Sequence, residues 1–230
     1  MNINKNYPCK STNYRKGRRD KIKYIVIHYV GATGSALNNV KYYGSADVGA
    51  SAHYYVGHAS ENGAIYQSVA PENCAWHCGS ETGKYYSECR NDSSIGIEMC
   101  CHKTGNNDWY FDDITIEKTI ELTKWLMQKY NIDANHVLRH YDVTRKQCPA
   151  PFVTNSEKWE LFKSRLVESE ELNMSQLIYN HIDGVPEFAR ATIKKLVDKK
   201  ILNGESNGLN LTYDMLRILV IIDRAGAFDK

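Results

Sequence analysis

The sequence predicts an α/β domain, built on a mixed central sheet flanked by helices, followed by a small all-helical module. Apolar residues fill both alternating faces of the run Ile22 to Val30, which is typical of a central strand covered on both sides. Further strand-like runs alternate with helical patterns, the strongest over Ile114 to Tyr130, and this order favours the α/β class. Beyond the acidic stretch at 168–171 the pattern is helical. We therefore predict two domains, residues 1–168 and 172–230.

Charge, hydropathy and cysteine content exclude several classes of protein. The 230 residues carry a formal net charge of +2, so no global field draws the chain to nucleic acid or to anionic lipid. The basic run Arg15 to Arg19 is interpreted as a solvated entry to the first strand. No apolar run reaches the roughly 18 residues of a membrane helix, and residues 1–6 lead into no signal-peptide core, so we expect synthesis in the cytoplasm and no membrane insertion. Seven cysteines at irregular spacings do not form the pattern of a disulfide framework.

The first central strand ends close to a histidine. His28 lies near the end of Ile22 to Val30, and Gly31 then breaks the strand. Ser35 offers an N-cap to a short helix from Ala36 to Gly44. Because the carboxyl ends of strands line the functional crevice in open α/β sheets, His28 is a candidate site residue.

A β-hairpin is predicted next. The runs Ala52 to Gly57 and Ala64 to Val69 are rich in Tyr, Val and Ile, and the turn sequence Ser-Glu-Asn-Gly at 60–63 lies between them. Two histidines, His53 and His58, fall on this hairpin. Neither repeats a metal-ligand spacing with His28 or His140, so we interpret both as unligated.

Soft metal-binding side chains gather in the following segment, Cys74 to Gly79. Cys74, His77, Cys78 and the later Cys89 could supply four ligands, and a second metal site is one interpretation. The Gly, Ser, Thr and Glu content around them favours instead a loop over the crevice.

The run Ser93 to Cys100 is predicted as another strand, in which Ile95 and Ile97 alternate against Gly96 and Glu98. A carboxylate within a mostly apolar strand costs free energy unless a cation opposes it. A metal centre would supply that cation. An exposed glutamate on a strand face is the alternative.

Two helices complete the first domain. The helix over Ile114 to Tyr130 has Asp112 or Asp113 as a candidate N-cap. A short strand then leads to His140, and a helix from about Asn155 to Val167 closes the domain.

The stretch Arg139 to Pro149 concentrates the chemistry of the chain, and its composition indicates a loop. It places His140 eight residues before Cys148, with Lys146 two residues before the thiol. One imidazole and one thiolate do not complete a zinc site, and the best third ligand is His28. Three protein ligands with a fourth position left for water are what a catalytic zinc needs, so the pattern predicts a Zn2+ hydrolase.

A strand ending in Ile-His together with a late His…Lys-x-Cys-Pro motif resembles the zinc amidase family. This family includes phage lysozyme-type amidases and bacterial N-acetylmuramoyl-L-alanine amidases, is related to peptidoglycan recognition proteins, and matches here over Tyr24 to Leu166. The resemblance implies cleavage of the amide between the lactyl group of N-acetylmuramic acid and L-alanine. It implies Glu98 facing the zinc as general base, Lys146 facing the developing oxyanion, and His77 in the substrate groove. A tyrosine that assists catalysis in some relatives is replaced here by Ala52.

The C-terminal module is predicted to contain three helices, Met174 to Ile182, Pro186 to Ile201, and Met215 to Arg224 capped by Thr212. So small a core usually gains stability on a neighbour, a copy of itself or a ligand surface. The pattern distantly resembles half of a surface-layer-homology repeat and the C-terminal modules of some lytic amidases. That resemblance implies binding to the cell wall, and self-association into a homo-oligomer is a second expectation.

The resulting expectation is a phage-type endolysin or autolysin that acts on peptidoglycan. The appended module favours this role because a small diffusing substrate needs no anchor. Without a signal peptide, such an enzyme would reach the wall through a membrane hole made by a separate pore-forming protein. Two alternatives remain: a cytoplasmic amidase that recycles small muropeptides, and a non-catalytic peptidoglycan-binding receptor, against which the presence of Cys148 argues.

Overall fold

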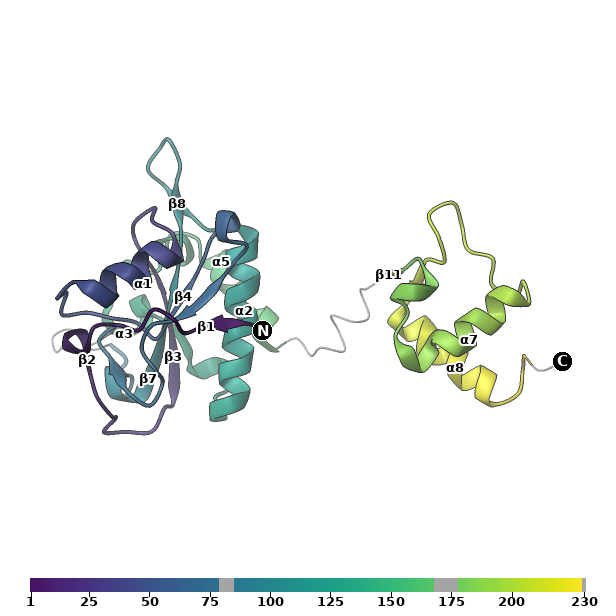
Figure 1. The fold of residues 1–230 in the computed structure, drawn as a ribbon, viewed down its shortest axis with the longest axis horizontal. Coiled ribbons are helices and arrows are strands. Elements are labelled where there is room, and N and C mark those ends of the chain that lie inside the picture. Colours follow the sequence, from purple (N-terminus) through teal and green to yellow (C-terminus); the bar gives the residue numbers. More distant parts are fainter. Residues whose placement is uncertain (79–84, 168–177, 229–230) are drawn as a thin grey trace. The chain divides into compact units, whose positions relative to one another are not determined.

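The computed structural model describes residues 1–78, 85–167 and 178–228, and the chain forms two compact units, Met1–Val167 and Glu168–Lys230 (Figure 1). The strands of the first unit are β1 (Ile3–Asn4), β2 (Tyr14–Arg15), β3 (Tyr24–Tyr29), β4 (Tyr54–Val56), β5 (Ile65–Gln67), β6 (Cys74–Ala75), β7 (Ser94–Met99), β8 (His102–Lys103), β9 (Trp109–Tyr110) and β10 (Val137–Arg139). Its helices are α1 (Ala36–Ser45), α2 (Asp113–Tyr130), α3 (His140–Thr144), α4 (Ala150–Val153) and α5 (Ser156–Val167).

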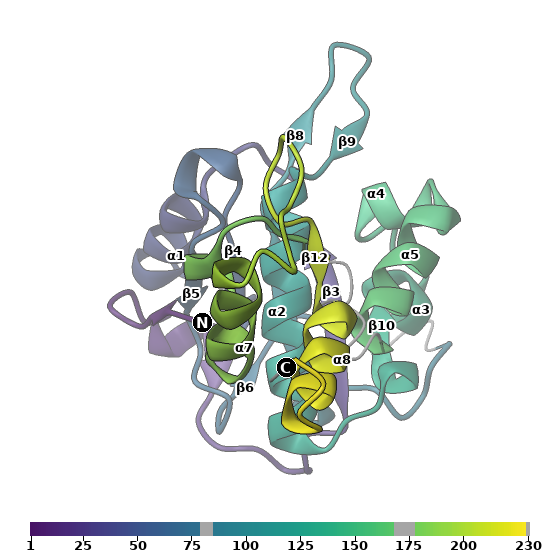
Figure 2. The same ribbon diagram turned by 90° about the vertical axis from the view of Figure 1, so that its right-hand side faces the viewer.

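Six strands form the central sheet in the order β1-β5-β4-β7-β3-β10. The four strands β4, β7, β3 and β10 are parallel, whereas β5 is antiparallel to β4, so the predicted mixed sheet is confirmed. The antiparallel pair of β4 and β5 is the predicted hairpin. In Figure 1 the strands lie between α1 on one side and α2 with α5 on the other, the arrangement of an α/β domain. Figure 2 shows the separate antiparallel pair of β8 and β9 extending away from these helices.

The two faces of β3 and β7 have different chemistry. One face carries isoleucines that join the large core under α2 and α5: Ile25, Ile27, Ile95 and Ile97. On the other face of β3, Tyr24 and Val26 are buried against Val143 of α3. The corresponding face of β7 carries Ser94 and Gly96, two small residues that leave room for a side chain from another segment.

Helix α1 begins where the sequence predicts. The Ser35 side chain accepts a hydrogen bond from the backbone N–H of Asn38 at 3.1 Å. A second cap comes from the carboxylate of Glu61, which accepts from the N–H groups of Ala36 and Leu37 at 2.6 and 3.0 Å. An anionic side chain at this end also complements the helix dipole.

Helix α2 matches its predicted limits to within a residue, but its cap works differently. Asp112 occupies the N-cap position without a side-chain bond to the helix. Its carboxylate instead accepts from the backbone N–H of Ala59 at 2.6 Å and lies 3.0 Å from Nε2 of His102. The helix ends at Asn131, whose φ of 53° is left-handed.

The prediction of a loop over Arg139 to Pro149 is wrong for residues 140–144, which form α3. Asp142 accepts hydrogen bonds from the backbone N–H and from the guanidinium of Arg139 at 2.8 Å each, and this closes the first turn. Val143 is buried beneath the sheet face described above. The local Arg139–Asp142 contact and the tertiary burial of Val143 together stabilise a helix that the composition does not indicate.

The second unit contains α7 (Glu187–Asp198), α8 (Tyr213–Arg224), a 3-10 turn (Ile182–Gly184) and a ribbon of β11 (Ile178–Tyr179) and β12 (Leu211–Thr212). The two helices confirm the helical module. The carboxylate of Asp223 on α8 joins them, accepting from Thr192 Oγ1 and Lys195 Nζ of α7, both at 2.7 Å. Thr212 caps α8 as predicted.

The ribbon of β11 and β12 is not predicted by the sequence pattern. The expected helix over Met174 to Ile182 is wrong for Ile178 and Tyr179, which form β11. Its residues 174–177 lie outside the described residues. Across the part of the chain that the structure describes, no helix combines the length and the apolar composition of a membrane span.

Candidate metal centre

Three predicted ligands come together at one edge of the central sheet. The donor atoms of His28, His140 and Cys148 lie within 4.8 Å of one another, the one such group of His, Cys, Asp or Glu side chains among the described residues. His28 Nδ1 is 3.7 Å from Cys148 Sγ. Nitrogen and sulfur ligands of one tetrahedral zinc are expected about 3.6 Å apart. The spacing therefore fits a shared metal ion.

The sheet positions the first two ligands. His28 is near the carboxyl end of β3, and β10 runs parallel beside β3 and ends one residue before His140. Cys148 is held by the backbone, because its C=O accepts from the N–H of Tyr141 at 2.8 Å and its N–H donates to Lys146 at 2.6 Å. All three side chains are buried, which limits competition from solvent.

The protonation states of the two histidines leave their ring nitrogens free to bind a cation. Burial lowers the pKa of His28 well below its usual range and the pKa of His140 to about 4, so both imidazoles are neutral near pH 7. Burial raises the pKa of the Cys148 thiol to about 12, and a bound cation would favour the thiolate. His140 Nδ1 is buried without a hydrogen-bond partner among the described residues. This soft, neutral donor set with an unused nitrogen fits zinc.

Glu98 lies on β7 directly opposite His28 on β3 in the strand register. Cross-strand partners point to the same face of a sheet, so the carboxylate faces the metal-binding side. Burial raises the pKa of Glu98 to about 8, with Lys146 acting in the opposite direction. Its Oε2 is buried and has no hydrogen-bond partner among the residues described. The unpaired carboxylate favours the predicted interpretation over an exposed strand-face glutamate.

His77 contacts His28 on one side and packs over Ser94 and Gly96 of β7 on the other. Its Nδ1 is 3.0 Å from His28 Nε2, and its Nε2 is 3.2 Å from Ser94 Oγ. Metal-ligating histidines commonly use their second nitrogen for such a contact, which fixes the ring orientation. An ideal Cβ on Gly96 would lie 2.6 Å from the His77 ring, so the glycine makes this position available. The predicted role of His77 in substrate binding stays a prediction.

A groove of about 730 Å³ opens beside this group. Its walls include Trp76, His77, Asn91, His140, Arg145 and Lys146. The groove thus brings one metal ligand together with two of the other predicted site residues. The alternative metal set of Cys74, His77, Cys78 and Cys89 is not grouped as ligands in the described residues.

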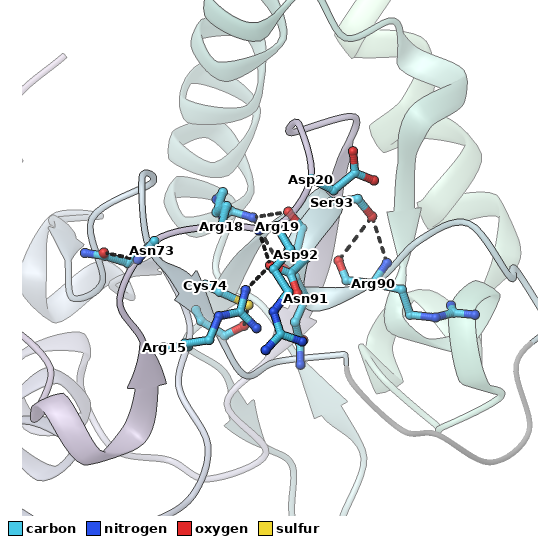
Figure 3. A network of polar contacts seen from close by, with 12 residues as sticks. Arg15, Arg18, Arg19, Asp20, Asn73, Cys74, Arg90, Asn91, Asp92 and Ser93 are labelled. Carbon is cyan, nitrogen blue, oxygen red and sulfur yellow. Dashed lines mark hydrogen bonds and ion pairs between the residues drawn. The ribbon is translucent and has the colours of Figure 1, made fainter.

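An arginine network that the sequence did not predict holds the wall of the groove (Figure 3). Arg18 donates to the backbone carbonyls of Asn91, Asp92 and Ser94 at 2.8 to 3.0 Å. The Asn91 side-chain oxygen in turn accepts from the backbone N–H of His77 at 3.0 Å. The interpretation of the basic run as solvated is wrong for Arg18, because its guanidinium is bonded to backbone carbonyls. These partners follow Arg18 by about seventy residues, and only the fold brings them together.

His28 near the carboxyl end of β3, His140 directly after β10 and Cys148 in the segment after α3 lie beside the unpaired carboxylate of Glu98. This arrangement fits an α/β protein with a candidate zinc site of the catalytic type. Comparison with known proteins identifies the family. The family model described as N-acetylmuramoyl-L-alanine amidase matches residues 18–151, and the chain belongs to that family.

Two curated amidases and one solved structure illustrate the relationship. N-acetylmuramoyl-L-alanine amidase BlyA of Bacillus subtilis (strain 168) is 36% identical over 159 residues, and CwlL of Bacillus licheniformis is 34% identical over 155 residues. Each match covers 63% of this chain and 41% of the relative, so the chain matches less than half the length of either amidase. A structure described as a mutant endolysin from Bacillus subtilis is 30% identical, with a TM-score of 0.57, and covers 72% of this chain and 99% of its own.

Proposed function

We propose that this protein is a zinc-dependent N-acetylmuramoyl-L-alanine amidase that degrades peptidoglycan, in the manner of an endolysin or autolysin. The observation that carries the proposal is the buried group of His28, His140 and Cys148 with Glu98 beside it, in a chain of the amidase family. The scissile bond is the amide between N-acetylmuramic acid and L-alanine.

In this proposal the three ligands hold one zinc ion, which supplies Lewis-acid polarisation of the amide carbonyl and lowers the pKa of a water molecule. Glu98 accepts the proton of the attacking water and passes it to the leaving nitrogen. The raised pKa of this carboxyl suits both halves of that transfer near neutral pH. Lys146, exposed at the groove, places a positive charge where the oxyanion develops.

His77 completes the arrangement in a supporting role. With its Nδ1 accepting from His28 Nε2–H, the ring fixes the tautomer in which His28 offers Nδ1 to the metal. Asn91 and Ser94 hold the backbone and the ring of His77, respectively. The same imidazole also lines the groove wall, so a substrate in the groove would pass beside it.

The test is mass spectrometry of purified peptidoglycan after digestion by the full chain. We expect free stem peptides with an N-terminal alanine and intact glycan strands. Cys148→Ala should lose zinc and release none. Glu98→Gln should keep zinc, measured by metal analysis, yet release far less.

Other outcomes would replace the proposal. New reducing ends without free stems would indicate a glycosidase. Cleavage of small muropeptides but not of intact walls would favour the recycling amidase. Tight wall binding without any released product would favour the receptor.

A further inference from the structure

The groove beside the metal-binding group has an unbalanced charge. Arg145 and Lys146 are both exposed in its wall. No Asp or Glu is among the described residues that line it. Two neighbouring cations without a facing carboxylate produce a positive potential, which favours an anionic group on the ligand.

Arg145 adopts an unusual backbone conformation. Its φ of 64° lies in the left-handed region, where a side chain other than Asn, Asp or Gly is uncommon. The residue terminates α3, and its N–H donates to the carbonyl of Tyr141 at 2.8 Å. Four of the six non-glycine residues with positive φ are asparagines, and the sixth is Lys200 in the second unit. Strain alone assigns no role, but it fixes where the Arg145 side chain leaves the backbone.

Two aromatic rings hold the guanidinium of Arg145. Its central carbon lies 4.6 Å from the ring centroid of Tyr85 and 5.0 Å from that of Tyr141. Tyr85 is itself tied to α3, because its N–H donates to the carbonyl of Val143 at 3.1 Å. Rings that contact the faces of a guanidinium leave its N–H edges available. Within the described part of the chain, no carboxylate or carbonyl accepts a hydrogen bond from this side chain.

We propose that Arg145 binds a carboxylate of the peptide stem and makes the site selective for stems in which that carboxylate is free rather than amidated. The inference rests on the proposed amidase function and identifies the substrate class within it. A planar guanidinium already oriented by two rings can donate two parallel hydrogen bonds to a carboxylate at little entropic cost. Lys146, the neighbouring cation, remains assigned to the scissile bond.

The experiment measures binding by calorimetry to the zinc-loaded full chain carrying Glu98→Gln, which slows turnover. The ligands are N-acetylmuramoyl-L-alanyl-D-glutamate and N-acetylmuramoyl-L-alanyl-D-isoglutamine, which differ only in that the α-carboxylate of the second residue is amidated in the latter. We expect the acid to bind about tenfold more tightly than the amide, the effect of one charge-assisted hydrogen bond. Adding Arg145→Gly or Arg145→Gln should reduce the ratio to within about twofold.

These variants separate charge from backbone effects. Glycine relieves the left-handed conformation, whereas glutamine retains it and removes only the charge. Lys200→Gly is the matched control, because it removes a cation at a φ of 56° outside the groove, and it should leave the ratio unchanged.

Equal affinity of the acid and the amide for the Glu98→Gln protein would overturn the inference. The inference would also be overturned if Arg145→Gly and Arg145→Gln both kept the tighter binding of the acid. Cleavage by the parental protein is followed separately with the same two compounds. Selective binding of the acid without any cleavage would contradict the proposed function but support the carboxylate site. Cleavage of both compounds without selective binding would support the proposed function but contradict the carboxylate site.

Discussion

At the residue scale, Glu98 is a buried carboxylate whose pKa is shifted far from its usual value. Its pKa is raised from 4.5 to about 8 by burial, because the carboxylate loses hydration on β7. In the unfolded chain the same group ionises near 4.5. Between these two values the folded state binds more protons than the unfolded state. Glu98 therefore destabilises the metal-free protein progressively as pH rises from about 4.5 to 8.

Glu98→Gln should separate the loss of stability caused by ionised Glu98 from the catalytic role of this residue. In metal-free protein we expect the variant to melt at a higher temperature than the parent at pH 8, with the difference shrinking towards pH 5. The slope is at most about 1.4 kcal/mol per pH unit for one group. With zinc, the variant should lose roughly 10²–10⁴-fold in turnover, as expected for loss of a general base. Thermal melts with and without a chelator, together with an amidase assay, measure both effects.

A melting-temperature difference that does not depend on pH would show that Glu98 ionises normally in the folded state. Turnover at the parental rate would remove it from the mechanism. Glu121→Gln is a suitable control, since this partly exposed carboxylate on α2, which pairs with Lys118, lies outside the groove.

At the element scale, the face of β7 that carries Ser94, Gly96 and Glu98 organises the site. A side chain at position 96 would occupy the space of the His77 ring, with an ideal Cβ 2.7 Å from His77 Nδ1. That nitrogen is the one in contact with His28. The small size of Gly96 on this strand therefore determines where His77 can lie, and His77 in turn orients the candidate ligand His28.

Gly96→Ala should displace His77 and weaken zinc binding by about 10–100-fold, the usual cost of losing such a partner. Competition with a chelator measures the affinity, and Gly105→Ala is the control because its added Cβ meets no atom within 4 Å. If the clash with His77 is the cause, Gly96→Ala should add little in a His77→Ala background. Independent, additive losses of zinc affinity would contradict this coupling.

Elements with strong periodicity or a clear cap were predictable from sequence. The buried strand β3 and the helix α2 are examples, and Ser35 marks the start of α1. The short helix α3 was missed because an Arg139–Asp142 contact stabilises it rather than its composition. That contact is local, but the burial of Val143 against β3 that accompanies it is tertiary, and local pattern carries little information about such burial.

The candidate site was predictable where its functional residues lie close together in the sequence or at the end of a recognisable strand. The spacing of His140 and Cys148 identified two candidate ligands, and the strand end identified His28, which the geometry brings to them. The contacts of Arg18 could not be foreseen, because its acceptors are backbone carbonyls that any residue could provide. The contact of His77 with His28 joins a residue after β6 to a residue of β3 that lies 49 positions earlier, and it has no sequence signal.

At the scale of the whole molecule, each unit has its own hydrophobic core. The second unit buries Val185, Ala189, Ile193, Leu196, Leu211, Leu216 and Val220. It also leaves apolar side chains of α8 exposed, among them Ile218 at 56% and Ile221 at 65%. A unit with a closed core and an exposed apolar helix face is suited to binding a partner surface. We propose the cell wall as that surface, with self-association as the competing role.

Truncation after Glu171 should therefore leave zinc binding and cleavage of small muropeptides largely intact, because every proposed site residue lies in the first unit. Attachment to whole walls should weaken, since linked binding sites raise the effective affinity for a repetitive polymer. Co-sedimentation with purified walls and light scattering of both proteins distinguish the roles. Equal wall binding by the truncated and full chains would exclude wall targeting. A full chain that stays monomeric at every concentration would exclude self-association, and a truncated chain that loses its zinc would mean that the first unit does not fold independently.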